Sequence, residues 1–186
     1  MRVIAGTRRS LPLRSLEGDA TRPTVDRYKE TLFNVLQADI PGCRFLDLFA
    51  GSGAIGIEAL SRGARHAVLV ENSRKAMAVI KENIHFTKFE DESDLILSDA
   101  VSYVRGLPTV DFDVIFMDPP YNHELEIAVL EVLAGKKFKN PNVRIVVEAA
   151  LEEDFGFLEG MPFRIEKVKA YKTNKHIFIR HEYAEI

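Results

Sequence analysis

The feature that most restricts the fold of this chain is a regular alternation between short apolar runs and longer stretches with helical periodicity. Five apolar runs occupy residues 44–49, 66–71, 94–99, 113–118 and 143–149. Short runs of this kind are typical of parallel strands that are buried on both faces. Between them, apolar residues recur every three to four positions, as they do on one face of a helix. The alternation predicts an α/β fold with right-handed crossovers and an open sheet covered by helices on both faces.

The carboxyl-terminal part of the chain departs from this alternation. Residues 163–183 read as two strands around a turn near Thr173 and Asn174, which predicts an antiparallel hairpin at the far side of the sheet. Together with the five apolar runs, the hairpin predicts a mostly parallel, seven-stranded sheet.

The amino-terminal part predicts a small extension to this domain. The segment "TRPTVDRYKETLFNVLQ" is typical of a helix capped by Thr24. The residues expected on its apolar face are Val25, Tyr28, Leu32, Val35 and Leu36. Before the helix, residues 2–6 and 11–15 are expected to pair as two short β segments. We therefore expect a β-hairpin extension over residues 1–23 and one domain over residues 24–186.

Length and composition restrict the class of protein further. With 186 residues, of which 46% are apolar, the chain is long enough for one packed core and too short for two full domains. Its single cysteine, Cys43, excludes an internal disulfide, which fits a reducing cytoplasm. No apolar run approaches the roughly 18 to 20 residues of a membrane span, and the histidines lack metal-ligand spacing. We expect a cytoplasmic protein with no metal and no membrane association.

The turn after the first run contains three glycines. The stretch "FAGSGAIG" places Gly51, Gly53 and Gly56 in a G-x-G-x-x-G pattern between a strand and a helix. Glycines there let the backbone approach a ligand closely, and the helix that follows offers unpaired N–H groups. Glu71 ends the second run, 20 residues after Gly51, where a carboxylate can accept both hydroxyls of a ribose. This spacing predicts a cofactor that contains a nucleoside.

The residues around the glycine turn favour one kind of cofactor. A dinucleotide would place a pyrophosphate there, but the turn has no basic residue and is preceded by an acid, Asp47. An ammonium group suits Asp47 better, and S-adenosylmethionine combines an amino acid with adenosine. Asp99 ends the third run, where it could accept from the adenine amine or could cap the helix that follows. Both roles of Asp99 stay open.

The fourth run ends in the turn Asp118-Pro119-Pro120-Tyr121. Adjacent prolines remove two backbone donors and stiffen the chain, so Asp118 and Tyr121 are held in nearly fixed positions. In a doubly wound sheet the fourth strand returns beside the first, at the switch point where ligands bind. We therefore expect Asp118 to lie next to Gly51, although the same residues could form no more than a rigid connection.

Taken together, these motifs resemble those of a known family. The stretches "DLFAGSGAIGIEAL" and "MDPPY" resemble the Rossmann-like class I methyltransferases that use S-adenosylmethionine to modify exocyclic amines. The stretches "RVIAGTRR" and "TRPTVDRYKETLFNVL" resemble the bacterial RsmD type, a family that methylates the N2 amine of one guanine in 16S ribosomal RNA. The resemblance covers nearly the whole chain. It implies a methyltransferase that acts on 16S rRNA, within the small ribosomal subunit.

The resemblance also implies roles for individual residues. The cofactor-binding residues would be Asp47, Phe49, Gly51, Ser52, Gly53, Gly56, Glu71, Asn72, Asp99 and Ala100. Asp118 and the Pro119 carbonyl would accept hydrogen bonds from the guanine amine. Tyr121 would stack on the base, and Pro120 would contact it.

Basic residues gather at both ends of a chain whose net charge is −3. Residues 1–29 carry seven Lys and Arg against three acids, and residues 163–180 carry six against one. If the fold brings these ends together, they could form one footprint for phosphates; otherwise they are ordinary solvated surface. The candidates for RNA contact are Arg2, Arg8, Arg9, Arg14, Arg22 and Arg27. Arg27 could instead pair with Asp26 or Glu30 on its own helix.

Other functions remain open on the sequence alone. The Asp-Pro-Pro-Tyr turn also occurs in DNA adenine and protein glutamine N-methyltransferases, so another amine could be the acceptor. A nicotinamide dehydrogenase would share the glycine turn and Glu71 but would not require Asp118 at the switch point. A binding module with a degenerate cofactor site is a third interpretation, which the intact glycine turn, Glu71 and Asp118 disfavour.

Overall fold

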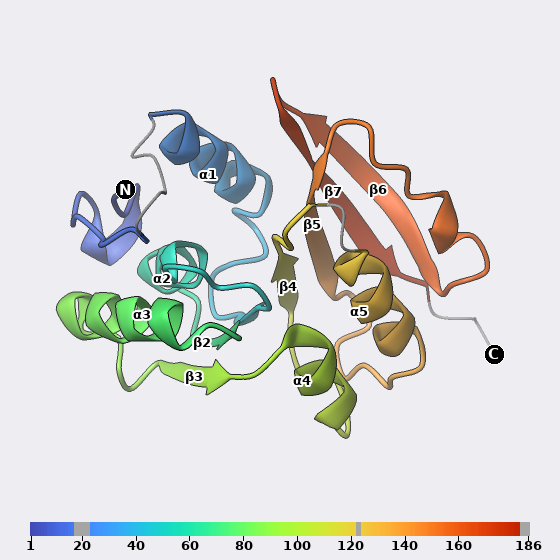
Figure 1. The fold of residues 1–186 in the computed structure, drawn as a ribbon, viewed down its shortest axis with the longest axis horizontal. Helices are drawn as coiled ribbons and strands as arrows, with labels where there is room; N and C mark the ends of the chain where they lie inside the picture. The colour runs from blue at the N-terminus through green and yellow to red at the C-terminus, as the bar shows by residue number, and fades with distance from the viewer. Residues whose placement is uncertain (17–22, 122–123, 183–186) are drawn as a thin grey trace.

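A computed structural model describes residues 1–16, 23–121 and 124–182, without the side chains of residues 23 and 24. In this part of the chain, seven strands form one sheet (Figure 1). In chain order they are β1 (Arg44–Asp47), β2 (His66–Glu71), β3 (Ser93–Leu97), β4 (Val114–Met117), β5 (Arg144–Ala150), β6 (Phe163–Ala170) and β7 (Asn174–His181).

The mostly parallel, seven-stranded sheet is confirmed. Its strand order is β3-β2-β1-β4-β5-β7-β6, and β7 runs antiparallel to both of its neighbours. The chain leaves β1 toward β2 and later returns to the other side of β1 as β4. Asp47 of β1 is in register with Leu69 of β2 and Phe116 of β4. The gap between these diverging connections is the switch point at which α/β sheets bind ligands.

Helices cover both faces of the sheet, as the alternation predicts (Figure 1). The helices are α1 (Pro23–Val35), α2 (Ala54–Ser61), α3 (Arg74–Thr87), α4 (Ala100–Gly106) and α5 (Leu125–Ala134). The first three pack on one face and the last two on the other. Neighbouring residues of β1 divide accordingly, because side chains alternate along a strand: Phe45 joins the α1–α3 core, whereas Leu46 joins the α4–α5 core.

Three strands end one or two residues earlier than the sequence pattern suggests. The first, third and fourth strands were expected to extend to residues 49, 99 and 118, but they end at 47, 97 and 117. Phe49, Asp99 and Asp118 therefore lie in the loops beyond the strands. Loops at the carboxyl ends of parallel strands are where α/β proteins carry their binding residues.

β3 corrects one expectation about burial. The third run was expected to be buried on both faces, but Leu97 is 46% exposed and no residue of β3 is fully buried. β3 pairs only with β2 and forms an edge of the sheet. An apolar run alone does not distinguish a central strand from an edge strand.

α1 also differs from its expected form. It begins at Pro23, so Thr24 lies inside the first turn and the expected Thr24 cap is wrong. Proline suits the first helical position because the N–H that it lacks would have no partner there. On the expected apolar face, Leu32 and Leu36 are buried, whereas Val25 is 39% exposed. Lys29, which the pattern did not place inside, is only 3% exposed.

The two amino-terminal segments pair through an isolated antiparallel bridge between Arg2 and Pro12 rather than through a ladder. A short 3₁₀ turn, η1 (Gly6–Arg8), connects them. Val3 and Leu13 are buried in the same core as α2 and α3. This part of the chain is therefore packed against the domain.

Glu58 on α2 joins the amino-terminal residues to the domain. Its buried carboxylate accepts from the backbone N–H groups of Ile4 at 2.8 Å and Ala5 at 3.0 Å. It also pairs with Arg62 at 2.7 Å and with Lys29 of α1 at 3.3 Å. One acid thus holds three segments together beside the glycine turn.

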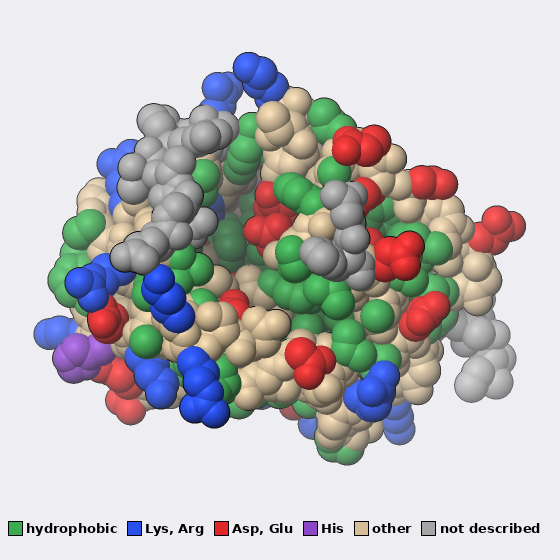
Figure 2. Space-filling view, in the orientation of Figure 1, with side chains coloured by type: hydrophobic (Ala, Val, Ile, Leu, Met, Phe, Trp, Pro, Cys, Tyr) green, Lys and Arg blue, Asp and Glu red, His purple; other side chains and the backbone are tan. Residues whose placement is uncertain are grey.

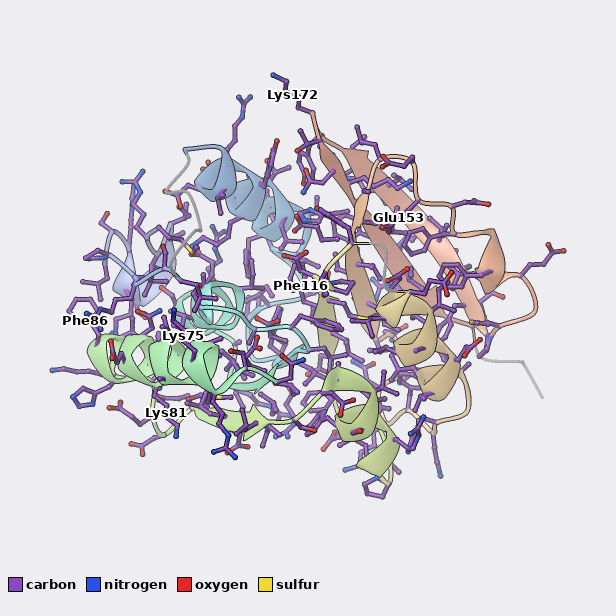
Figure 3. The ribbon with its side chains drawn as sticks, in the orientation of Figure 1. Lys75, Lys81, Phe86, Phe116, Glu153 and Lys172 are labelled. Carbon is purple, nitrogen blue, oxygen red and sulfur yellow. The ribbon has the colours of Figure 1, made fainter. Side chains whose placement is uncertain are left out.

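The expected carboxyl-terminal hairpin is formed by β6 and β7, and its tip reaches α1. The rings of Tyr171 at the tip and Tyr28 on α1 have centroids 4.6 Å apart. Lys172 projects from the same tip (Figure 3). A second 3₁₀ turn, η2 (Gly156–Leu158), precedes β6. Within the described ranges, none of the helices has the length and apolar character needed to cross a bilayer.

Candidate active site

The three glycines of the turn between β1 and α2 serve different purposes. Gly51 has a φ of +55°, and a Cβ atom there would meet nothing within 4 Å. Gly53 is the N-cap of α2 and has a φ of +82°. A Cβ atom at Gly56 would come within 3.0 Å of the Leu69 side chain on β2. Gly51 therefore leaves the backbone open to a ligand, whereas Gly56 allows α2 to pack closely on the sheet.

Glu71, at the end of β2, is attached to the glycine turn. Its carboxylate accepts from the backbone N–H groups of Gly51 at 2.9 Å and Ser73 at 2.8 Å. Glu71 also lines a hollow of about 70 Å³ together with Asn72, Asp99 and Ala100. Phe49 borders both this hollow and a larger cleft. Five of the residues expected to bind the cofactor thus surround one space.

Asp99 takes the capping role, one of the two that its position suggested. It is the N-cap of α4, and its carboxylate accepts from the backbone N–H of Ser102 at 2.8 Å. Hydrogen bonds from Ser102 are the main cause of the lowered pKa of Asp99. The side chain is also exposed at the edge of the hollow. A carboxylate that caps a helix retains further lone pairs for a ligand.

Asp47 lies beneath the glycine turn and is only 1% exposed. Neither of its carboxylate oxygens has a hydrogen-bond partner among the described residues. Burial, with a smaller contribution from Glu71, raises the pKa of Asp47 to about 7, and the nearby amides of Phe49 and Gly56 oppose this shift. Asp47 does not line the cleft, so it would act on a ligand through the turn above it rather than as part of the cleft wall.

The larger cleft, of about 470 Å³, opens between α1 and the carboxyl ends of β1, β4 and β5. Figure 2 shows it as the hollow at the centre of this face, with acidic side chains beside it. Gly51, Ser52 and Asp118 all line the cleft. Phe116, labelled in Figure 3, forms part of its floor. The structure therefore places the glycine turn and the end of β4 at one site, as the strand order predicts.

Three of the four residues in the Asp-Pro-Pro-Tyr turn are exposed to solvent. Asp118 and Pro120 are exposed, Pro119 is buried, and Tyr121 is 43% exposed. Partial burial and then the charges of Glu148 and Asp118 raise the pKa of Tyr121 to about 12. Tyr121 therefore presents an uncharged, accessible ring beside the cleft, as base stacking requires.

The cleft also contains residues that were not anticipated from the sequence. Glu148 near the carboxyl end of β5 and His176 on β7 line the wall formed by the sheet, and Tyr28 and Lys29 line the wall formed by α1. The sequence could have predicted Glu148 as a site residue, because it is an acid near the carboxyl end of a strand, as Glu71 is. The sequence could not have predicted His176 as a site residue, because only the antiparallel register of β7 places it beside the carboxyl ends of the parallel strands.

The arginines expected to contact RNA differ in whether their side chains are already engaged by other residues. Arg8 donates to the Thr87 carbonyl at 2.7 Å and lies over the Phe89 ring, and Arg14 pairs with Glu82. Arg2 pairs with Asp26 at 3.4 Å. Arg9 and Arg27 are exposed, and in the part of the chain that the structure describes neither forms an ion pair. The alternative in which Arg27 pairs with Asp26 or Glu30 is therefore not observed. Arg22 lies outside the described residues.

The charges of the cleft fit a cationic cofactor. Asp118 and Glu148 line it, Asp47 lies beneath it, and Lys29 is paired with Glu58. A pyrophosphate would meet acids here, whereas the ammonium and sulfonium groups of S-adenosylmethionine would meet favourable charge. Among the described residues, no group of three or more His, Cys, Asp or Glu is placed to hold a metal.

The strand order, the glycine turn and the cleft at the switch point define a class I methyltransferase. The solved structure of yhhF from Escherichia coli has a TM-score of 0.83 to this chain and 30% sequence identity. The match covers 99% of each chain.

The family described as "Conserved hypothetical protein 95" matches residues 1–180, and the chain belongs to this family. A relative from Haemophilus influenzae, named ribosomal RNA small subunit methyltransferase D, is 36% identical over 150 residues, which are 80% of this chain and 78% of that protein. The protein of the same name from Escherichia coli is 34% identical over 154 residues, covering 82% and 76%.

Proposed function

We propose that this protein transfers a methyl group from S-adenosylmethionine to the exocyclic N2 amine of one guanine in 16S ribosomal RNA. The observation that carries the proposal is the cleft at the switch point, in which the glycine turn and Asp118 meet. The relatives named ribosomal RNA small subunit methyltransferase D support rRNA as the acceptor. The substrate is the small ribosomal subunit, in the cytoplasm.

The cofactor side of the site consists of the hollow and the glycine turn. Glu71 would accept the ribose hydroxyls, and Asn72, Asp99 and Ala100 would surround the adenine. Gly51 and Ser52 would face the amino-acid part, with Gly53 and Gly56 shaping the turn and Asp47 lying beneath it. When bound, S-adenosylmethionine would supply an electrophilic methyl group, whose bond to the sulfonium sulfur breaks on transfer and leaves a neutral thioether.

The acceptor side is the turn at the end of β4. Asp118 and the Pro119 carbonyl accept hydrogen bonds from the guanine amine, and the Tyr121 ring stacks on the base next to Pro120. Positioning of this kind lowers a reaction barrier by about 7 to 11 kcal/mol in favourable cases. The amine releases one proton when its new bond to carbon forms. Asp118, which is exposed, can accept that proton or direct it to water.

RNA binding uses exposed basic residues from both ends of the chain. Arg9 and Arg27 are exposed in the amino-terminal part of the chain. Lys172 projects from the hairpin tip that packs against α1 (Figure 3). These residues belong to the two basic ends of the chain. Phosphate contacts orient an RNA without reading its sequence. Residues 1–23 and the hairpin tip therefore guide the RNA, while the cleft receives the base.

The test uses S-adenosylmethionine labelled in its methyl group. The protein is incubated separately with small ribosomal subunits, large subunits, DNA and a protein extract, all from cells that lack the gene. Label in the RNA of small subunits alone is the expected result. Label confined to DNA or protein would overturn the rRNA assignment while leaving methyl transfer in place.

A further inference from the structure

The wall of the cleft opposite the glycine turn contains a hydrogen-bonded network. Glu148 of β5 and His176 of β7 are direct partners across the two strands. Nε2 of His176 lies 3.1 Å from one oxygen of Glu148, and Nδ2 of Asn174 donates to the other oxygen at 2.5 Å. The Tyr171 hydroxyl lies 2.9 Å from Nδ1 of His176. Four side chains from β5, β7 and the hairpin tip thus form one chain of contacts.

The proton positions in this network follow from whether each group can donate or accept a hydrogen bond. A carboxylate only accepts, so Nε2 of His176 donates to Glu148. In a neutral imidazole Nδ1 then accepts, and the Tyr171 hydroxyl donates to it. Partial burial and the charge of Glu148 raise the pKa of Tyr171 to about 12, so that its proton is retained. Each oxygen of Glu148 has one donor behind it, and the carboxylate is held as an acceptor.

This carboxylate faces the place where the target base must lie. Glu148 and Asp118 both line the cleft, and 20% of the Glu148 side chain remains exposed. Tyr28 and Leu32 of α1 form an apolar wall beside them. The charge of Glu148 is the largest electrostatic contribution to the raised pKa of Tyr121. The charge of Glu148 therefore acts on the ring on which the base is proposed to stack.

We infer that Glu148 reads the Watson–Crick edge of the target base and selects guanine, an inference that rests on the proposed function. Guanine presents N1–H and the N2 amine as neighbouring donors, and a carboxylate accepts from both at once. Adenine and cytosine present a ring nitrogen lone pair at this position, which the charge of Glu148 would repel. Uracil has N3–H but no neighbouring amine. Discrimination therefore comes from an unfavourable contact as well as from a favourable one.

The same contact would position the reacting nitrogen. Glu148 holds one hydrogen of the N2 amine, while Asp118 and the Pro119 carbonyl hold the other. With both hydrogens held in the plane of the base, a face of the nitrogen is left free for the methyl group. His176 acts through Glu148 and is a positioning residue, because at 1% exposure it is buried behind the carboxylate.

The experiment uses small subunits whose target guanine is replaced by 2-aminopurine. This base keeps the N2 amine but lacks N1–H, so it removes the donor assigned to Glu148. We expect wild-type protein to prefer guanine by roughly tenfold or more in kcat/KM, the discrimination that one bidentate contact gives. In Glu148→Gln the preference should fall at least fivefold, because the amide can donate to the bare N1. The Kd of the cofactor should stay within twofold.

Two further variants complete the test. Glu159→Gln removes an exposed acid outside the cleft and should keep the wild-type preference. Glu148→Asp keeps the charge and should keep most of the preference. Equal rates on both bases with wild-type protein would overturn the inference even if no variant folds, as would an unchanged preference in Glu148→Gln. Both results leave guanine methylation intact, whereas a wild-type protein that methylates no RNA overturns the proposed function itself.

Discussion

The backbone N–H of Gly51 donates a hydrogen bond to Oε2 of Glu71 at 2.9 Å and joins the first glycine of the turn to the acid that ends β2. The other oxygen of the same carboxylate accepts from Ser73 at 2.8 Å. Two backbone donors thus fix Glu71 at the edge of the hollow. The residue that would read the ribose also sets the shape of the turn over which the rest of the cofactor would lie.

Replacement of Glu71 by alanine should weaken S-adenosylmethionine binding by at least tenfold. The change removes the acceptor proposed for the ribose hydroxyls and releases the Gly51 amide. Titration calorimetry measures the effect. Glu92→Ala is the matched control, since Glu92 is exposed at the amino end of the sheet. An unchanged Kd for Glu71→Ala would remove this residue from the cofactor site.

Asp118→Ala should reduce methyl transfer to small subunits by at least tenfold in kcat. The substitution removes the carboxylate proposed to hold the amine while leaving the two prolines of the turn. Cofactor affinity should change less than twofold, because Glu71 and the glycine turn are untouched. Single-turnover kinetics with saturating cofactor measure the step, and a near-wild-type rate would exclude Asp118 from the mechanism.

Tyr121→Ala should weaken RNA methylation but leave cofactor binding nearly unchanged. Stacking on an aromatic ring contributes about 1 to 3 kcal/mol per base, so kcat/KM should fall by roughly tenfold or more. Tyr121→Phe keeps the ring and should behave like the wild type. If Tyr121→Phe proves as defective as Tyr121→Ala, then the hydroxyl matters and stacking does not explain the effect.

Glu58→Ala should lower the free energy of unfolding by about 3 to 5 kcal/mol, as expected when one partner of a buried ion pair is removed. Lys29 would stay buried without its partner, and the Ile4 and Ala5 amides would lose their acceptor. Urea unfolding followed by circular dichroism measures the loss. Glu82→Ala, which breaks the exposed pair with Arg14, should cost less than about 1 kcal/mol. Equal losses in the two variants would contradict a structural role for Glu58.

Asp47 should make the free energy of unfolding depend on pH in the opposite direction from an acid whose pKa is lowered by folding. Its folded-state pKa of about 7 lies above the unfolded value, so the folded protein binds an extra proton below pH 7. Its contribution to stability therefore falls as the pH rises from about 4 toward 7, and it stays low above that range. Relative to wild type, Asp47→Asn should gain roughly 2 kcal/mol between pH 5 and pH 8. If the difference in unfolding free energy between Asp47→Asn and the wild type does not change with pH, the raised pKa is contradicted.

Most of the fold could be predicted from the apolar periodicity of the sequence and from the strand order that this pattern implies. Alternating apolar runs are sufficient to predict the parallel strands, because burial on both faces leaves a continuous apolar pattern. The pattern does not say which strand lies at an edge, so the exposure of Leu97 was missed. It also could not place Lys29 inside, because that position depends on Glu58 arriving from another helix.

The residues that line the cleft and the hollow were predictable wherever they follow parallel strands. Glu71, Asp99 and Asp118 were found because each stands at the carboxyl end of a run, and Glu148 satisfies the same rule. His176 could not be found in this way, since β7 is antiparallel and presents its first residues at this edge. Basic residues were recognised as a group, but local packing decides which are free, as the Arg8 contact with Phe89 shows.

Identification of the nucleoside that receives the methyl group is the measurement that tests methylation of guanine N2 most directly. Small subunits from cells lacking the gene are incubated with the protein and labelled S-adenosylmethionine, and the 16S RNA is digested to nucleosides for mass spectrometry. The predicted product is N2-methylguanosine at a single position, absent with Asp118→Ala. Label in any other nucleoside, or none in RNA although the cofactor binds, would contradict the assignment of the Asp-Pro-Pro-Tyr turn to the guanine amine.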